Sequence, residues 1–245
     1  MVNHLLGASN TLFNAALASY LIRPENSGFI FTHSMLQEAI YNSYLSRQKK
    51  DLHDQAADWY SGKDMILEAR HLDRSENPRA PGVYFNAAED CKERFEFTNG
   101  LPLAERGIEL AEQMPEKYRL TCLQAFMTRE IGKSEEAIQL YKDAIKMIEE
   151  EELHCEAWIG IAACNRWMGK GEESFEVLKQ TEKVAKSNDL PLRLTQVGYY
   201  RGSYLFTRNE LDRAEASYQS GLDNAKQCSD KLWAARNLSG LADCY

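Results

Sequence analysis

The fold of this chain follows from the stretch Gly132-Lys133-Ser134-Glu135-Glu136-Ala137-Ile138-Gln139-Leu140-Tyr141-Lys142-Asp143-Ala144. A turn former is followed by a small residue, a large residue four positions later, and a second small residue three positions further on. On a helix the last three positions share one face. Small side chains let two antiparallel helices approach closely, and the large one fills a hole in the neighbouring pair. The stretch therefore predicts a tight turn and the second helix of a packed hairpin.

The pattern occurs four times. Its small anchor residues stand at intervals of 33, 37 and 40 positions, at Ala104, Ala137, Ser174 and Ala214. The turn formers five positions before the anchors are Asn99, Gly132, Gly169 and Asn209. The large residues four positions after them are Ile108, Tyr141, Leu178 and Tyr218. A repeating unit of this size is typical of stacked helical hairpins, because one hairpin cannot bury its apolar face alone.

The last segment, from Lys231 to Tyr245, is predicted to be the first helix of a fifth hairpin, with Ala242 at the small position. A solenoid that ends on half a hairpin exposes an apolar face. We therefore expect the chain to be part of a longer protein.

Composition narrows the function classes. The net charge of −8 disfavours broad nucleic-acid binding, which needs a basic surface. No stretch approaches the ~20 apolar residues that span a bilayer, so we expect no membrane association. The six cysteines have no metal-ligand spacing, and we interpret them as reduced residues of a cytoplasmic protein. No cofactor or metal is expected, since His53 and His71 stand 18 positions apart with no further ligand in register.

The first 80 residues break the repeat. A helical pattern over 12–21 is followed by turn residues over 23–28 and by the β-prone Phe29-Ile30-Phe31, and a helix starts at Ser34. This order predicts the last part of a small winged-helix module. We expect a winged-helix-like remnant over 1–48, connecting helices and a linker over 49–82, and repeats over 83–245.

The alanine register of residues 83–245 resembles the tetratricopeptide repeat, although two of the intervals exceed the ideal 34 residues. The resemblance implies an all-α solenoid that winds as a right-handed superhelix. It would contain four hairpins and half of a fifth, after the small winged-helix-like part. In such arrays the first helix of each hairpin lines a concave groove.

Phe29-Ile30-Phe31-Thr32-His33-Ser34-Met35-Leu36-Gln37-Glu38-Ala39-Ile40-Tyr41, followed by Arg47-Gln48-Lys49-Lys50-Asp51-Leu52-His53, resembles a junction of signal-transduction ATPases with numerous domains (STAND). In that family, which includes regulators associated with bacterial adenylate or guanylate cyclases and large transcriptional activators, an ATPase precedes a winged helix and helical repeats. This chain has no GxxxxGK[ST] motif, since Met127 stands where Gly132-Lys133-Ser134 would need a glycine. Any ATPase or cyclase activity would therefore belong to other segments.

The resemblance singles out His33. A histidine at this place in related ATPases contacts the phosphate of bound ADP, which is chemically reasonable at a helix start. Ser34 replaces the aspartate that usually follows. The alternative interpretation is a histidine that makes a local hydrogen bond.

By register, a partner-binding groove would be lined by Arg119, Cys122, Phe126, Arg129, Ile159, Arg166, Gln196, Tyr199, Ser203 and Phe206. Its arginines would favour a carboxylate or an acidic segment of a protein or peptide. Surface arginines that serve only solubility are the alternative.

Nothing in the chain pairs a nucleophile with a base, so we expect no enzyme. The sequence predicts a protein-interaction and regulatory module of a multidomain signalling ATPase that relays partner binding to output domains. The alternative is a solenoid of a transcription activator that senses a small molecule.

Overall fold

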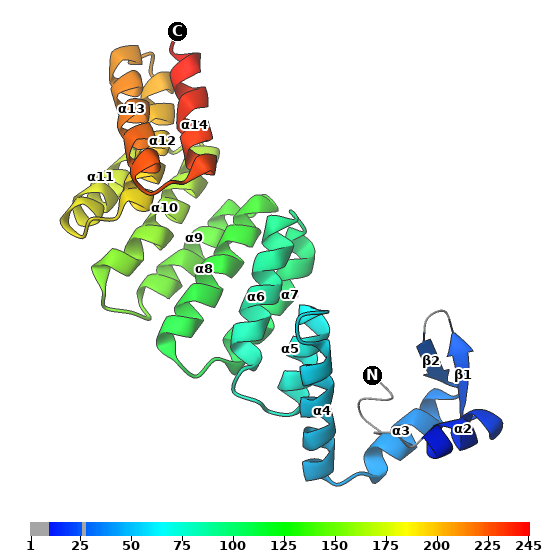
Figure 1. The fold of residues 1–245 in the computed structure, drawn as a ribbon. Helices are drawn as coiled ribbons and strands as arrows, with labels where there is room; N and C mark the ends of the chain where they lie inside the picture. The colour runs from blue at the N-terminus through cyan, green and yellow to red at the C-terminus, as the bar shows by residue number, and fades with distance from the viewer. Residues whose placement is uncertain (1–9, 26–27) are drawn as a thin grey trace. The chain divides into compact units, whose positions relative to one another are not determined.

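The computed structural model describes residues 10–25 and 28–245. The chain divides into two compact units, Met1–Ala87 and Ala88–Tyr245. Within the described residues there are thirteen α-helices and one two-stranded sheet (Figure 1). Asn26 and Ser27 of the predicted turn lie outside the described residues, as do the first nine residues.

The first unit begins with a helix, a β-hairpin and a second helix. Strands β1 (Ile22–Glu25) and β2 (Gly28–Phe31) pair antiparallel, with Ile22 opposite Phe31. The helices are α2 (Asn10–Ala18), α3 (Ser34–Ser43), α4 (Ser46–Tyr60), α5 (Met65–Arg74) and α6 (Ala80–Glu93), of which α6 runs across the unit boundary. Of the side chains described from α2 to α3, none is fully buried.

Helices α4 and α5 form the first packed helical hairpin. The Asp64 carboxylate accepts hydrogen bonds from the backbone N–H groups of Ile66 and Leu67, which fixes the start of α5. Ala57 of α4 and Ala69 and Leu72 of α5 have no exposed surface. The region predicted to hold connecting helices and a linker, 49–82, contains most of α4, all of α5 and the start of α6 at Ala80.

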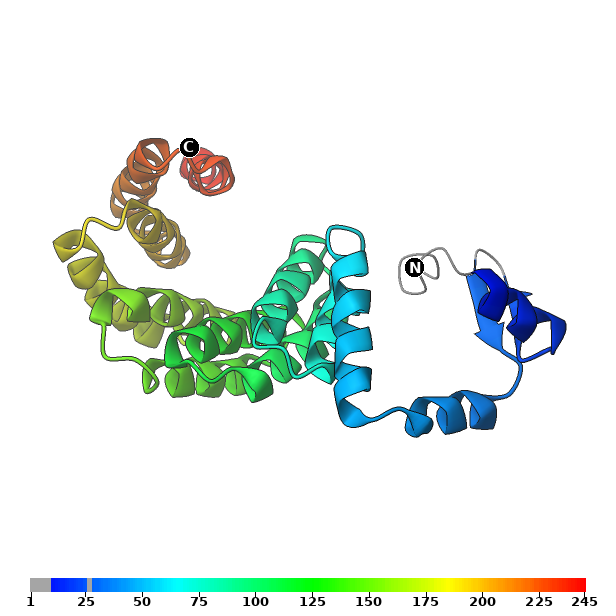
Figure 2. The same ribbon diagram turned by 60° about the horizontal axis from the view of Figure 1, so that its bottom comes forward.

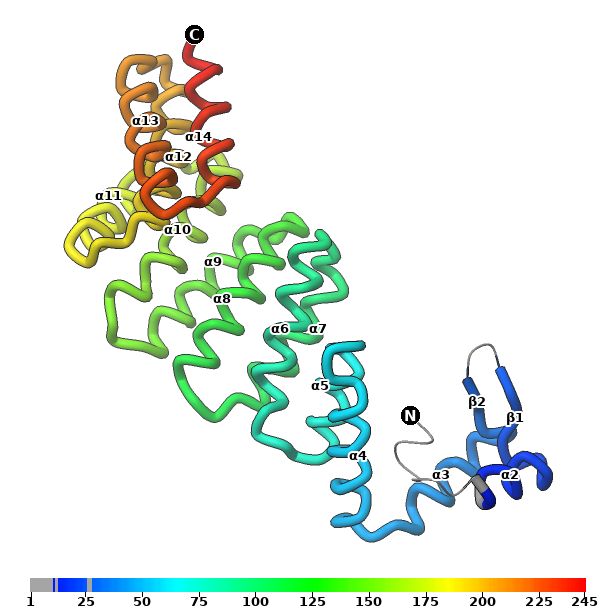
Figure 3. Tube along the Cα trace, in the orientation of Figure 1, coloured from blue at the N-terminus to red at the C-terminus, as the bar shows by residue number. Residues whose placement is uncertain are grey.

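The second unit is a succession of antiparallel helical hairpins, which the trace in Figure 3 follows. Its helices are α7 (Phe97–Leu110), α8 (Met114–Glu130), α9 (Ser134–Ile145), α10 (Glu151–Trp167), α11 (Gly171–Ser187), α12 (Pro191–Thr207), α13 (Leu211–Gln227) and α14 (Lys231–Asp243). The anchors Ala104, Ala137, Ser174 and Ala214 are all buried, as the repeat pattern predicts. The Ser174 hydroxyl donates a hydrogen bond to the carbonyl of Ala162, which links the two helices of its hairpin.

Three of the four predicted turn formers occupy the turns. Gly132, Gly169 and Asn209 have φ of 88°, 74° and 61°, the left-handed region that glycine and asparagine tolerate best. The prediction for Asn99 is wrong, because Asn99 lies inside α7. In this hairpin the left-handed residue is Phe95, with φ of 62°. The Glu96 N–H donates a hydrogen bond to the carbonyl of Cys91, which caps the end of α6. Helix α7 therefore starts one turn earlier, relative to its anchor, than α9, α11 and α13 do.

Helix α14 is the predicted half hairpin. Gly240 is its small residue against the preceding hairpin, where a Cβ would lie 2.3 Å from the ring of Tyr218. Ala242 is exposed. Ala162 has the equivalent position in α10 and meets the second helix of its own hairpin. In this chain no helix follows α14, so Ala242 lacks the corresponding contact.

Candidate functional site

The first helices of successive hairpins form one continuous surface within the second unit. Helix α10 contacts α8 and α12, and α12 contacts α14, whereas the second helices α9, α11 and α13 make at most marginal contacts with one another. The row of hairpins curves (Figure 2), and the side on which neighbouring helices touch is the inner side of the curve. We call the face formed by α8, α10, α12 and α14 the inner surface.

An aromatic cluster lies where α12 meets α14. The ring of Trp233 lies 5.6 Å from that of Tyr199 and 5.9 Å from that of Tyr200, both edge to face. The two tyrosine rings are themselves 5.2 Å apart. Edge-to-face contacts of this kind add stability beyond the area buried. The cluster gives the inner surface a rigid aromatic floor.

Three arginines from three different inner helices surround this floor. The positive charges of Arg129, Arg166 and Arg236 all act on the hydroxyl of Tyr200 and oppose the effect of burial, which raises its pKa. The Arg236 guanidinium stacks on Trp233 at 4.4 Å, and that of Arg166 lies 5.8 Å from the ring of Trp167. Among the described residues, neither Arg166 nor Arg236 has a carboxylate within ion-pair distance. The inner surface therefore carries uncompensated positive charge in a chain that is acidic overall.

Arg129 is the most buried of the three, since only 10% of its side chain is exposed. It donates from Nε and Nη2 to one oxygen of Glu130, at 3.0 and 2.6 Å, and its guanidinium lies 4.7 Å from the ring of Phe126. Lys92 approaches the same ring at 5.3 Å. Burial disfavours the charge of Arg129, but the nearby Tyr141, Tyr200 and Glu130 favour it and raise its pKa. Arg129 is thus a positive charge held in a fixed position.

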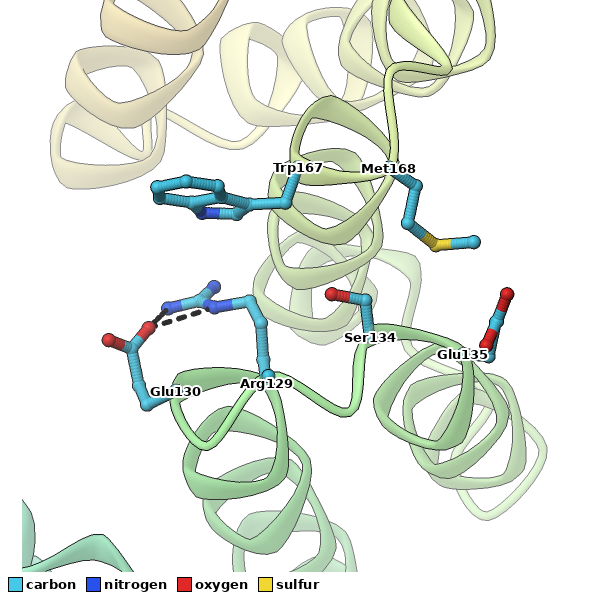
Figure 4. A pocket seen from close by; sticks show the side chains of 7 residues that line it. Arg129, Glu130, Ser134, Glu135, Trp167 and Met168 are labelled. Carbon is cyan, nitrogen blue, oxygen red and sulfur yellow. Dashed lines mark hydrogen bonds and ion pairs between the residues drawn. The ribbon is translucent and has the colours of Figure 1, made fainter.

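A pocket of about 430 Å³ opens beside Arg129, at the turn between α8 and α9. Its lining residues are Arg129, Glu130, Gly132, Ser134, Glu135, Trp167 and Met168. In Figure 4 the indole of Trp167 lies across the opening from the Arg129 guanidinium. Trp167 is 75% exposed, which is unusual for so large an apolar side chain. A flat group can be held between an aromatic wall and a cation in this geometry.

The structure places the predicted groove residues in two classes. Exposed or half-buried are Arg119, Phe126, Arg129, Arg166, Gln196, Tyr199 and Phe206. Cys122, Ile159 and Ser203 are buried between helices, where Ser203 accepts a hydrogen bond from the hydroxyl of Tyr218. These three side chains therefore do not reach the surface.

The sequence prediction missed Arg236 and Trp233. Both lie on α14, and Arg236 stands 40 positions after Gln196, the same interval that separates the anchors Ser174 and Ala214. The available signal was an arginine one helical turn after a tryptophan, which places the two side chains next to each other.

His33 is the residue before the first turn of α3. Its backbone is extended, with φ of −133° and ψ of 128°, its side chain makes no capping hydrogen bond, and it is exposed. Its backbone carbonyl accepts from the N–H groups of Leu36 and Gln37.

His53 and His71 come together although they are far apart in the sequence. Their Nδ1 atoms lie 2.9 Å apart, and the hydroxyl of Tyr41 lies 2.9 Å from Nε2 of His53. Spacing along the sequence did not reveal this pair, because α4 and α5 bring it together across a hairpin. Within residues 10–25 and 28–245, no three histidine, cysteine or acidic side chains cluster as metal ligands, and no helix is long and apolar enough to cross a membrane.

Comparison with known proteins relates the chain to helical-repeat structures. No family model matches the sequence. An uncharacterized protein of Rhizobium meliloti (strain 1021) is 25% identical over 160 residues, which cover 58% of this chain and 16% of that protein. The chain thus corresponds to a small part of that relative's length.

Three solved structures share the fold at low sequence identity. A signal-transduction ATPase with numerous domains from Pyrococcus horikoshii, which carries a tetratricopeptide-repeat sensor, is similar over 100% of this chain and 38% of its own, with a TM-score of 0.63 and 16% identity. A Rap protein complexed with competence and sporulation factor has a TM-score of 0.60 and 14% identity, over 86% of this chain and 67% of its own. YrrB, a tetratricopeptide-repeat protein with an unusual peptide-binding site, has a TM-score of 0.51 and 11% identity, over 84% and 98%. The chain has the tetratricopeptide-like solenoid fold. The described part of the chain is essentially all helical, as predicted.

Proposed function

We propose that the chain is a non-catalytic interaction and regulatory module that holds an acidic segment of a protein partner on its inner surface. The supporting observation is the pair Arg166 and Arg236, two exposed cations without a described carboxylate partner beside an aromatic floor. Arginine binds carboxylates with two parallel hydrogen bonds, and aromatic rings add contact area at low entropic cost. The chain as a whole carries a net charge of −8, so these two arginines form a local positive site on an acidic protein. Such a site attracts a negatively charged ligand.

Binding of a glutamate-rich dodecapeptide, labelled with fluorescein and followed by anisotropy, tests the proposal. We expect it to bind more tightly than the matching peptide in which each glutamate is glutamine. Arg166→Glu and Arg236→Glu should each weaken binding by at least about 10-fold, since each reverses a charge at the site. Arg213→Glu makes the same charge change on the outer helix α13 and is the control, because Arg213 lies away from the inner helices.

The proposal fails if the two peptides bind equally, or if Arg213→Glu weakens binding as much as the inner-surface variants do. Binding should also weaken steeply with salt, since the interaction is electrostatic.

A small-molecule ligand is the second candidate, and the pocket between Arg129 and Trp167 supports it. A metabolite that binds the folded state raises the melting temperature by linkage. A thermal-shift screen of anionic and aromatic metabolites should then give a shift that Trp167→Ala removes. A broad library without any shift would count against this candidate.

We further propose that this module belongs to a multidomain signalling ATPase and works in the cytoplasm. The order of a hairpin-containing module before helical repeats supports the family, and the absence of disulfides among the six cysteines supports the compartment. In this proposal residues 1–48 are a winged-helix-like remnant, 49–82 connect, and 83–245 are the repeats. His33, exposed at the start of α3, would contact bound nucleotide. The full-length reading frame tests this proposal. If no P-loop is encoded upstream of the segment described by this chain, the assignment to a signalling ATPase is contradicted.

A further inference from the structure

Helix α3 is joined to the first helical hairpin through a chain of three side chains. The hydroxyl of Tyr41, on α3, is hydrogen-bonded to Nε2 of His53 on α4, and Nδ1 of His53 is hydrogen-bonded to Nδ1 of His71 on α5. The ring of Tyr60 stacks on His71, with centroids 5.5 Å apart and the planes 11° from parallel. His53 is 8% exposed. The chain of hydrogen bonds connects three helices, from the exposed ring of Tyr41, at 43% exposure, through the buried ring of His53 to the half-buried ring of His71.

The contact between the two imidazoles depends on the number of protons they hold. A hydrogen bond between two Nδ1 atoms needs one nitrogen that donates and one that accepts. When both rings are neutral, His53 can donate to His71 from Nδ1 and accept from Tyr41 at Nε2. When both rings are protonated, two N–H groups and two positive charges face each other across 2.9 Å. The contact cannot persist in that state.

The surroundings oppose protonation. Burial, followed by the charges of His71 and Arg74, lowers the pKa of His53 to about 4, while Asp54 acts in the opposite direction. Burial and Arg74 also lower the pKa of His71. Lys49, which lies on α4, places its ammonium 4.5 Å from the ring of Tyr41 and adds a further positive charge near the contact. The Asp54 carboxylate, on the same helix as His53, partly offsets these effects.

We propose that Tyr41, His53 and His71 form a proton-sensitive tether that holds α3 against the α4–α5 hairpin at neutral pH and releases it in acid. The tether is local to the first unit and does not depend on the partner proposed for the inner surface. Failure of peptide binding would leave it standing. In the intact protein it would make the position of the N-terminal module respond to pH.

Hydrogen exchange of the full chain, measured by mass spectrometry at pH 7.5 and pH 5.0, tests the tether. Labelling times are scaled for the intrinsic exchange rate at each pH, and EDTA is present so that no metal can bridge the two rings. A group with an ordinary pKa of 6.5 that is held at about 4 takes up a proton when the contact opens. For His53 alone, opening becomes roughly 30-fold more favourable at pH 5.0. We expect the protection of residues 34–43 to fall by at least about 10-fold, and that of α12 to stay unchanged.

Two variants make the result specific. In His71→Gln the side-chain carbonyl can still accept from His53 but cannot take up a proton. The part of the pH response that comes from the charge and titration of His71 should therefore disappear, while the part that comes from burial of His53 remains. Tyr41→Phe removes the hydroxyl that joins α3 to the pair, so α3 should be weakly protected at both pH values. His154→Gln is the control, because His154 is a buried histidine of α10, in the second unit, and is bonded to the carbonyl of Ile148.

Titration of the histidine ring signals by NMR gives an independent readout that does not need a variant to fold. Both His53 and His71 should titrate below 6.5. The proposal is overturned if α3 is equally protected at both pH values in the unaltered chain, if His71→Gln keeps the full response, or if His53 titrates at its ordinary value.

Discussion

The phenol ring of Tyr141, on α9, occupies the space in which a side chain at position 160 of α10 would lie. A Cβ added to Gly160 would stand 2.2 Å from Cζ of Tyr141. Tyr218 makes the same contact with Gly240 in the last hairpin, at 2.3 Å. At these two places the large residue of one hairpin inserts against a glycine in the first helix of the next, and the missing side chain lets the two hairpins approach closely.

Gly160→Ala should destabilise the second unit by about 1–3 kcal/mol, because the buried ring of Tyr141 has little room to move. Urea unfolding monitored by circular dichroism measures the change. In the double variant Gly160→Ala with Tyr141→Leu the two effects should be less than additive, since the smaller side chain removes the clash. Strict additivity would show that the two residues do not interact.

Gly132→Ala should lower the free energy of unfolding by about 1 kcal/mol, because φ of 88° is costly for a residue with a Cβ. There is open space around this position, so a steric clash does not contribute. Asn209→Gly changes the equivalent turn in the opposite sense and should have little effect or a slight benefit. Thermal unfolding of both variants distinguishes backbone strain from general sensitivity of the turns.

Arg201 joins three helices. Its Nη1 donates to Glu182 of α11 at 2.5 Å, and its Nε donates to the Ser217 hydroxyl of α13 at 3.1 Å. Arg201→Met should lower stability by about 1–2 kcal/mol in chemical denaturation, since both partners are half-buried or buried. Arg208→Met, which breaks exposed ion pairs with Glu172 and Glu210, should cause no measurable loss.

The contribution of Glu182 should depend on pH. Burial acts to raise the pKa of its carboxyl, but Lys186 and Arg201 outweigh burial and lower it below 4.5. The carboxylate therefore stabilises the fold above its ordinary pKa, and this contribution is lost as the pH falls through the lowered value. Stability measured from pH 7 to pH 3 should decrease less in Glu182→Gln than in the unaltered chain. Equal slopes would contradict the ion pair.

Alkylation of the native chain with iodoacetamide at pH 8 should modify Cys228 and Cys244 before the other cysteines. Those two are half-buried, whereas Cys91, Cys122, Cys155 and Cys164 are buried. Burial raises the pKa of Cys122 to about 12 and that of Cys164 to about 11, so both remain thiols. Peptide mapping by mass spectrometry checks the order, and all six should react in guanidinium chloride. Early modification of Cys122 would mean that the hairpins open readily.

The register of small and large residues was enough to predict the helical hairpins and the buried anchors Ala104, Ala137, Ser174 and Ala214, because close packing of helices restricts the residues at their contacts. Glycine or asparagine five positions before the anchor correctly predicted three of the turns. It failed at Asn99, where the capping structure around Phe95 ends α6 earlier. Asparagine is tolerated in a helix as well as in a turn, so its presence alone could not decide between them.

The groove was harder to predict than the fold. A helical pattern identifies which residues share a face, but it does not say whether that face meets solvent or the next helix. Cys122, Ile159 and Ser203 share the face of the groove residues yet are buried. Ile159 packs in a cluster with Val197 of α12, and Ser203 meets Tyr218 of α13, the second helix of its own hairpin.

The sequence by itself determined the repeating hairpin, three of its four predicted turns and the acidic charge, since these depend on composition and on residues close together in the chain. Only the tertiary structure decided which charges and rings meet. Arg129, Arg166 and Arg236 act together on Tyr200 from three helices, and His53 reaches both Tyr41 and His71. The physical reason is that stacking and crossing of helices, which depend on the packing of whole hairpins, bring together residues that no local spacing relates.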